Sequence, residues 1–169
     1  MDAPCIPEDH GHLRVESISH INEVFRRSKM TLICDKNLMN IDIHNLTIEL
    51  RETILAALAL SDWNLRAWTM LEAFQGRHNI WLLFKDNRTV SFTETLEMVH
   101  QYGAVDIAIL LATLGHLLPS ARMLASDPSR DGGPIFELIN DDEAEYLLRH
   151  RHASRPKDKE VIQQLLTRY

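Results

Sequence analysis

The feature that most constrains the fold is a long helical stretch between two short runs of β-prone residues. The runs are "MTLICD" (30–35) and "NIWLLF" (79–84), both compact and apolar. Between them, "LTIELRETILAALALSD" (46–62) has helical patterning, with Thr47 as its expected N-cap. Short strands that alternate with helices predict an α/β fold, in which a small, mainly parallel sheet is flanked by helices.

The same patterns predict the remaining elements. Asp86 and Asn87 indicate a turn between two short strands in "NIWLLFKDNRTVSF". Gly76 and Gly103 are natural helix terminators, and Thr93 is the expected N-cap of the helix that ends at Gly103. Residues 1–7 read as a short strand. Further helices are predicted at about 13–28, 62–76, 104–119, 141–149 and 157–167.

Composition restricts the classes of function. The 169 residues are 45% hydrophobic, enough for one domain with a real core. A net charge of −6 provides no global attraction to nucleic acid or anionic lipid. The basic run 149–159 directly follows several acidic residues, so we expect its side chains to lie on a solvated, internally paired surface. No secretory signal is recognisable, and the longest apolar segment, 104–119, is too short to span a bilayer comfortably. A cytoplasmic protein is therefore expected.

The helix predicted over 62–76 is apolar on two sides. At about 100° per residue, one face is a stripe of Trp63, Ala67, Met70, Leu71 and Phe74. Leu65, Trp68 and Glu72 fall on roughly the opposite side. This helix therefore carries one acid, Glu72, in otherwise apolar surroundings.

The residues alone leave two interpretations of Glu72 open. In the structural one, the carboxylate pairs with a neighbouring arginine such as Arg66, Arg77 or Arg88, since buried acids normally have partners. In the functional one, Trp68 packs beside Glu72 at a cleft and fits it for hydrogen bonding to a sugar hydroxyl or for proton transfer.

Other residues are weaker candidates for a metal ligand, a nucleophile or a general base. Cys5, His10 and His12 lie close enough in sequence to suggest a metal, but a fourth ligand is not evident, so no metal site is predicted. Cys34, at the end of an apolar run, is expected to be a small buried side chain. His100 sits singly on a helix, as packed or surface histidines do.

Three stretches resemble a known family. "DAPCIP" (2–7), "MTLICDKNL" (30–38) and "RAWTMLEA" (66–73) are similar, in order, to the heterokaryon incompatibility (HET) domain of filamentous fungi, whose motifs read roughly W-I-D-x-L-C-I-P/N and R-x-W-T-x-Q-E. "LLRHRHASRPKDKEVIQQLL" (147–166) resembles a segment often found downstream of that domain. The resemblance implies a role in non-self recognition and regulated cell death, through association with copies of itself or another protein.

A more distant resemblance implies a reaction. The TIR domain, a three-layer fold of the flavodoxin-like kind, has a helix with W-C-L-x-E whose glutamate is essential for NAD cleavage. The step from Trp68 to Glu72 matches that spacing. By this likeness NAD would be the substrate, Trp68 would support it, and Glu72 would stabilise the oxocarbenium-like state as nicotinamide leaves.

The departures from the HET pattern set the remaining expectations. The family's earlier strand, with an A-L-S-Y-x-W-G-like motif, is not present, and Leu71 stands where the family usually has glutamine. We therefore expect a partial HET-like domain at 1–118, a flexible loop at 119–134 and a helical C-terminal extension at 135–169. An inactive truncated fragment is the third alternative, beside the signalling module and the NAD glycohydrolase.

Overall fold

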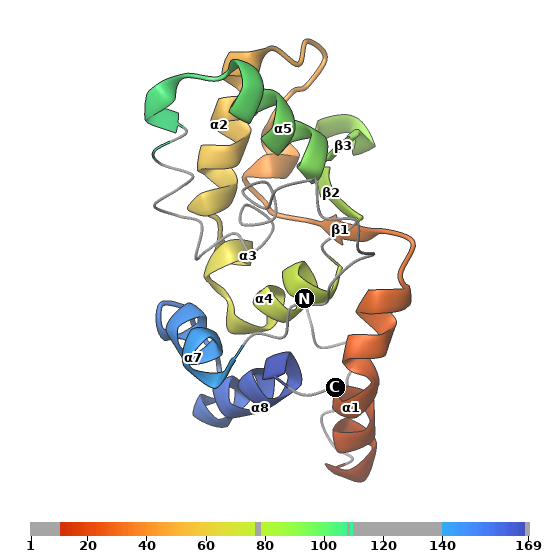
Figure 1. Ribbon diagram of the computed structural model, residues 1–169. Coiled ribbons are helices and arrows are strands. Elements are labelled where there is room, and N and C mark those ends of the chain that lie inside the picture. Colours follow the sequence, from red (N-terminus) through yellow and green to blue (C-terminus); the bar gives the residue numbers. More distant parts are fainter. Residues whose placement is uncertain (1–10, 77–78, 108, 110–139, 168–169) are drawn as a thin grey trace, which may run out of the picture.

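The computed structural model describes residues 11–76, 79–107, 109 and 140–167. A three-stranded sheet and a set of flanking helices make up the described part (Figure 1). The strands are β1 (Thr31–Ile33), β2 (Ile80–Leu83) and β3 (Thr89–Ser91). The α-helices are α1 (Gly11–Arg27), α2 (Ile48–Ala59), α3 (Asp62–Leu65), α4 (Ala67–Gln75), α5 (Phe92–Tyr102), α7 (Asp141–Arg149) and α8 (Pro156–Thr167). Short 3₁₀ turns occur at η2 (Leu38–Asn40) and η3 (Lys85–Asn87).

The sheet is mixed, with the order β1-β2-β3. β1 and β2 run parallel, in a register that places Ile33 beside Leu82, and α2 to α4 form the crossover between them. β2 and β3 are antiparallel and are joined by the turn at Asp86 and Asn87, which both have φ of 58°. Asparagine and aspartate tolerate this left-handed conformation, and it suits a tight hairpin. The predicted α/β class and the predicted hairpin are confirmed.

One face of the sheet packs against α2 and α5. The core on this face combines residues of the strands, the helices and the intervening loops: Ile33, Leu38, Ile43, Ile54, Leu55, Leu58, Trp63, Ala73, Ile80, Leu82, Phe84, Val90, Phe92, Leu96 and Val99. We call these residues the first cluster. Successive strand residues point to opposite faces, so Leu32 and Trp81, adjacent in the register, lie on the other face, where Leu32 is exposed and Trp81 half-buried.

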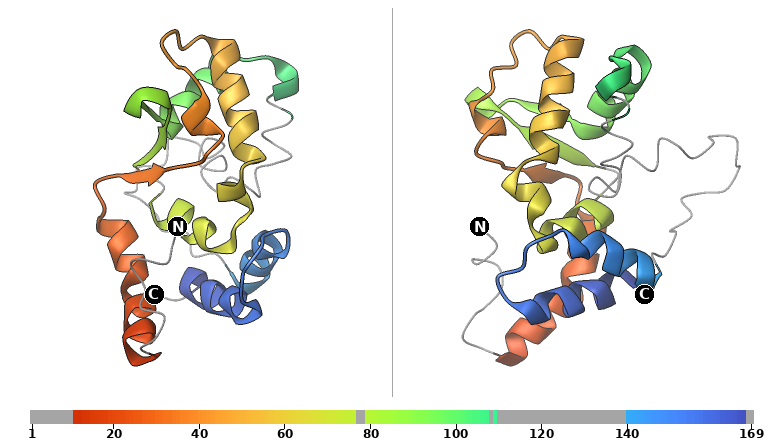
Figure 2. Two further views of the ribbon diagram at one scale, coloured as in Figure 1. Left: turned by 180° about the vertical axis from the view of Figure 1, so that it is seen from behind. Right: turned by 90° about the vertical axis from the view of Figure 1, so that its left-hand side faces the viewer.

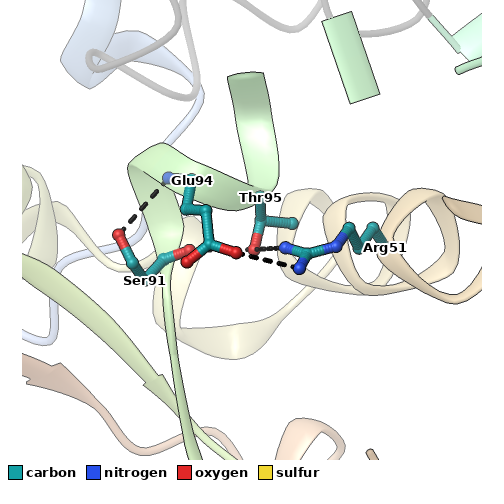
Figure 3. Close-up of polar contacts among 4 residues, drawn as sticks. All are labelled: Arg51, Ser91, Glu94 and Thr95. Carbon is teal, nitrogen blue, oxygen red and sulfur yellow. Dashed lines mark hydrogen bonds and ion pairs between the residues drawn. The ribbon is translucent and has the colours of Figure 1, made fainter. Parts of the chain in front are cut away.

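A polar contact fixes α5 against α2 (Figure 3). Arg51 is buried on α2, and its guanidinium donates to the Glu94 carboxylate at 2.9 Å and to the Thr95 hydroxyl at 3.5 Å. The Ser91 hydroxyl accepts from the Glu94 N–H at 3.3 Å and caps α5. The prediction of Thr93 as the cap was wrong, because the helix begins directly after β3 and places Ser91 at the capping position.

The predicted helix over 62–76 is broken. Arg66 has extended backbone angles, φ −80° and ψ 141°, and separates α3 from α4. The break is tertiary in origin, since Ala67 N–H donates to the His152 carbonyl and His152 N–H donates to the Leu65 carbonyl, both at 2.7 Å. These bonds form a parallel bridge with a segment far along the chain. Periodicity within 62–76 carries no signal for such a partner.

The other predicted boundaries hold in the described part. Thr47 caps α2 by accepting from the Leu50 N–H, and Gly76 and Gly103 end α4 and α5. α1, α7 and α8 match the predicted helices. The strand predicted at 1–7 and all but the start of the helix predicted at 104–119 lie outside the described residues. The division at 118 and 134 falls there too and stays a prediction.

Candidate functional site

The candidate site centres on α4, which lies between the sheet and the C-terminal helices α7 and α8 (Figures 1 and 2). Ser61 caps α3 by accepting from the Asn64 N–H at 3.1 Å. The Thr69 hydroxyl donates to the Arg66 carbonyl at 2.7 Å and also contacts the Trp63 carbonyl. The Ser61 hydroxyl thus supplies an acceptor to an N–H in the first turn of α3, and the Thr69 hydroxyl supplies a donor to the Arg66 carbonyl at the break.

Glu72 is half-buried on α4, and its carboxylate faces an indole. Its Oε2 accepts from Trp63 Nε1 at 3.2 Å. A continuous helix would have placed Trp63 on the opposite face from Glu72, so that part of the sequence interpretation is corrected: the break at Arg66 turns the buried Trp63 toward the acid. One indole N–H occupies one of about four acceptor positions of a carboxylate.

Trp68, the second predicted site residue, contacts a different acid. Its indole N–H donates to Asp158 Oδ2 on α8 at 3.0 Å. Trp68 is half-buried and packs against the C-terminal helices. The indole hydrogen bond to Glu72 therefore comes from Trp63, whereas that of Trp68 joins α4 to α8. Of the predicted pairing partners of Glu72, Arg77 lies outside the described residues.

Arg151 is the residue at this site that sequence reasoning missed. It is only 2% exposed, and its guanidinium donates to the carbonyl and side-chain oxygens of Asn64 and to the Arg66 carbonyl, at 2.5, 3.2 and 3.2 Å. Burial lowers the pKa of Arg151 to about 10, so the side chain is still a cation at neutral pH. The expectation that the run 149–159 is a solvated surface was wrong for this residue.

A signal for the burial of Arg151 did exist in the sequence. If the helix predicted over 141–149 is continued to Arg151, its spacing of four and three residues from Leu147 and Leu148 puts the arginine on their apolar side, although α7 itself ends at Arg149. Both leucines are buried against α4. The many charged residues of the run 149–159 predicted a solvated surface instead, so the position of Arg151 was missed.

The remaining candidate residues, Cys34 and the histidines, lie on the surface or outside the described residues. Cys34 is exposed, contrary to expectation, because it continues the alternation of β1 and falls on the side of Leu32. His12 and His100 are exposed on α1 and α5, whereas Cys5 and His10 lie outside the described residues. Within the described ranges, no three His, Cys, Asp or Glu side chains gather closely enough to hold a metal ion. In the same ranges, no helix has the length and apolar character to cross a membrane.

Comparison with known proteins gave no match: no family model, no curated protein and no solved structure is similar to this chain. The chemistry of the site must therefore be argued from its own contacts. Those contacts link α3 and α4 to α8 and to the residues between α7 and α8. The donors and acceptors described above, on Trp63, Trp68, Glu72 and Arg151, form hydrogen bonds to other parts of the same chain.

Proposed function

We propose that this chain is a signalling module of the heterokaryon incompatibility type, which promotes regulated cell death in a fungal cytoplasm by associating with copies of itself or with another protein. The proposal includes a TIR-like three-layer arrangement of the sheet and its helices. Its support is the ordered resemblance of 2–7, 30–38 and 66–73 to the HET motifs, together with the contacts that residues 66–72 make in the fold.

The observation that carries the proposal is that residues 66–72 form hydrogen bonds to other parts of the same chain. Trp68 donates to Asp158, the Arg66 carbonyl accepts from Arg151, and the Glu72 carboxylate accepts from Trp63. Each contact joins the segment 66–72 to another part of the chain. Residues that hold several segments together are expected in a module that presents a defined surface, and they do not require a reaction.

The competing function is NAD cleavage with Glu72 as the catalytic acid. The half-buried position of Glu72 favours it, because a partly exposed carboxylate beside an aromatic ring can reach a ribose hydroxyl. The two functions make opposite predictions for the charge of Glu72. A glutamine side chain keeps an oxygen that accepts from Trp63 but cannot stabilise a developing positive charge as a carboxylate does.

The test is inducible expression of the chain in a fungal host, with growth arrest and cellular NAD measured together for the wild type and Glu72→Gln. The proposed module predicts growth arrest by both proteins and an unchanged NAD level. Loss of growth arrest and of NAD consumption in Glu72→Gln would instead establish the enzyme. A folded wild type that leaves growth unaffected at high expression would contradict both functions and support the inactive fragment.

Arg149→Gln serves as the matched control. Arg149 is exposed on α7, and its removal changes one charge without touching the segment 66–72. Circular dichroism of each purified variant shows whether it is folded, so that a loss of growth arrest is not mistaken for a loss of structure.

A further inference from the structure

Two surfaces within the described residues carry opposite charge. The first is the corner where α1 ends and the chain turns into β1, and we call its residues, 23–32, the basic corner. It contains three cations and one acid, namely Arg26, Arg27, Lys29 and Glu23. The whole chain has a net charge of −6. The basic corner therefore has the opposite sign to the molecule that carries it.

The basic corner also exposes apolar side chains. Val24 on α1, Met30 in the connection and Leu32 on β1 are 61%, 50% and 38% exposed. The neighbouring Arg26 and Arg27 both pair with Glu23, and Lys29 is exposed beside Met30 in the sequence. Exposed apolar side chains that are bordered by charge are typical of a surface that binds a partner.

The second surface is the outer side of α7. This helix contains four acids and one arginine, which give it a net charge of −3. Its inner side carries its buried residues, which pack with α4 and α8. Asp142, Glu145 and Tyr146 are all exposed, and we call these three residues the acidic face. The acidic face thus combines negative charge with an accessible aromatic ring.

The two surfaces lie on different sides of the molecule. Figure 1 shows the end of α1 at the right and α7 at the lower left, and the reverse view in Figure 2 agrees. One copy therefore does not bring its own basic corner to its own acidic face. A contact between two different patches of identical chains is heterologous and joins the copies head to tail.

We infer that copies of this chain associate head to tail, with the basic corner of one copy on the acidic face of the next. Charge complementarity selects this occupant: the corner has a net charge of +2 and α7 of −3, whereas two corners or two α7 helices repel each other. The apolar side chains of the corner then face Tyr146, and tyrosine is enriched at protein interfaces. The inference deepens the proposed function, on which its biological meaning rests.

The unmodified full-length chain is measured first. Its average mass in sedimentation equilibrium is expected to rise with protein concentration in about 0.02 M salt and to return to the monomer value in about 0.5 M salt, because salt screens exposed charges. Since a heterologous contact leaves both outer surfaces open unless a ring closes, the mass should pass the dimer value. A chain that stays monomeric at every concentration in low salt would overturn the inference.

Two charge-reversed chains give the decisive test. One carries Arg27→Glu and Lys29→Glu in the basic corner, and the other carries Asp142→Lys and Glu145→Lys in the acidic face. Each chain alone brings like charges together at the head-to-tail contact, so its association should weaken at least about tenfold. An equimolar mixture restores opposite charges at both kinds of contact and should associate about as strongly as the wild type. A mixture as weak as its separate components would refute the inference.

A chain with Lys85→Glu and Arg88→Glu provides the matched control. Both side chains are exposed at the turn between β2 and β3, and their reversal changes the net charge by the same amount as the reversal in the basic corner. This chain should associate like the wild type. An equal loss in the control would overturn the inference, because net charge rather than its location would then determine association. Circular dichroism shows that each variant is folded.

An anionic membrane is the other occupant that the basic corner could take. Wild-type chain that sediments with vesicles of anionic phospholipid, but stays monomeric in their absence, would overturn the inference. Growth arrest by a monomeric chain would likewise overturn it and leave the proposed function intact. Association without growth arrest would contradict only the proposed function.

Discussion

The indole N–H of Trp63 donates to the carboxylate of Glu72 across the break between α3 and α4, at a distance of 3.2 Å. The two residues belong to different helices, and the extended backbone of Arg66 brings them together. Trp63 is buried in the first cluster, whereas Glu72 lies on α4, whose Ala67, Met70 and Leu71 pack in a separate apolar cluster with α7 and α8. This hydrogen bond therefore links the two parts of the core.

Trp63→Phe is expected to destabilise the protein more than Glu72→Gln does. Phenylalanine keeps most of the apolar contact but lacks the donor, and a hydrogen bond to a charged group contributes about 1.5–3 kcal/mol. Glutamine keeps the acceptor, so its cost should be below about 1 kcal/mol. Urea unfolding of the two variants and the wild type measures both values. Equal losses would show that the charge of Glu72, rather than its hydrogen bond, matters to folding.

Arg151→Met should cost about 3 kcal/mol. The substitution removes the Arg151 donors to the carbonyl and side-chain oxygens of Asn64, and each buried acceptor left without a donor costs about 1–3 kcal/mol. The Arg66 carbonyl also loses its bond from Arg151 but keeps the one from the Thr69 hydroxyl. Arg149→Met, on the exposed side of α7, should change stability by less than about 0.5 kcal/mol. Thermal unfolding compares the two, and similar losses would contradict the buried role of Arg151.

The effect of Arg151 on stability has a defined pH dependence. Burial lowers its pKa from the ordinary arginine value to about 10, so the folded and unfolded chains both hold the proton between pH 7 and 9. The stability difference between wild type and Arg151→Met should therefore be constant in that window. Above pH 10 the unfolded chain holds more protons at this site, so this residue contributes a rise in wild-type stability with pH. Unfolding curves at pH 7, 8 and 9 check the constant part.

Sequence patterns predicted the elements whose signals are local. Helix periodicity predicted α1, α2, α7 and α8, and the turn residues Asp86 and Asn87 predicted the hairpin. These features depend on the spacing of neighbouring residues, which a sequence displays directly. Local signals were therefore sufficient for most of the described secondary structure.

The site required information that is not local. The break at Arg66 arises from a bridge to His152, and the partner of Trp68 is Asp158, 90 residues away. The burial of Arg151 depends on carbonyls that only the break exposes. Sequence reasoning selected Glu72 and Trp68 as special residues but placed Trp63 on the opposite side from Glu72, because it extended one helix through Arg66.

Asp42 provides a test of surface electrostatics. Its Oδ1 lies 2.5 Å from His44 Nδ1 and accepts from the His44 N–H at 3.0 Å. The hydrogen bond from the His44 side chain holds the pKa of Asp42 below its usual value of 3.8. Nuclear magnetic resonance titration of the carboxyl carbon should show this low value, and His44→Ala should raise it.

The stability contribution of Asp42 follows from the direction of that pKa change. Because the folded pKa is lower than the unfolded one, the contribution is present above the usual pKa and is lost as pH falls through the folded value. Both side chains are exposed, so the effect should weaken in concentrated salt. An unchanged Asp42 titration in His44→Ala would contradict the contact.

Gly76 should not tolerate a larger side chain, because α4 ends there against β1. A Cβ at this position would lie 2.2 Å from Thr31 Oγ1 and 2.8 Å from the Glu72 carbonyl oxygen. Gly76→Ala must therefore displace β1 or the end of α4, and overpacking of this kind costs about 1–3 kcal/mol. In the Thr31→Ala background, which lacks the hydroxyl, the same substitution should cost at least about 0.5 kcal/mol less. Urea unfolding of the four proteins in this double-mutant cycle measures the coupling, and additive losses would show that the strand and the helix end do not meet at these two residues.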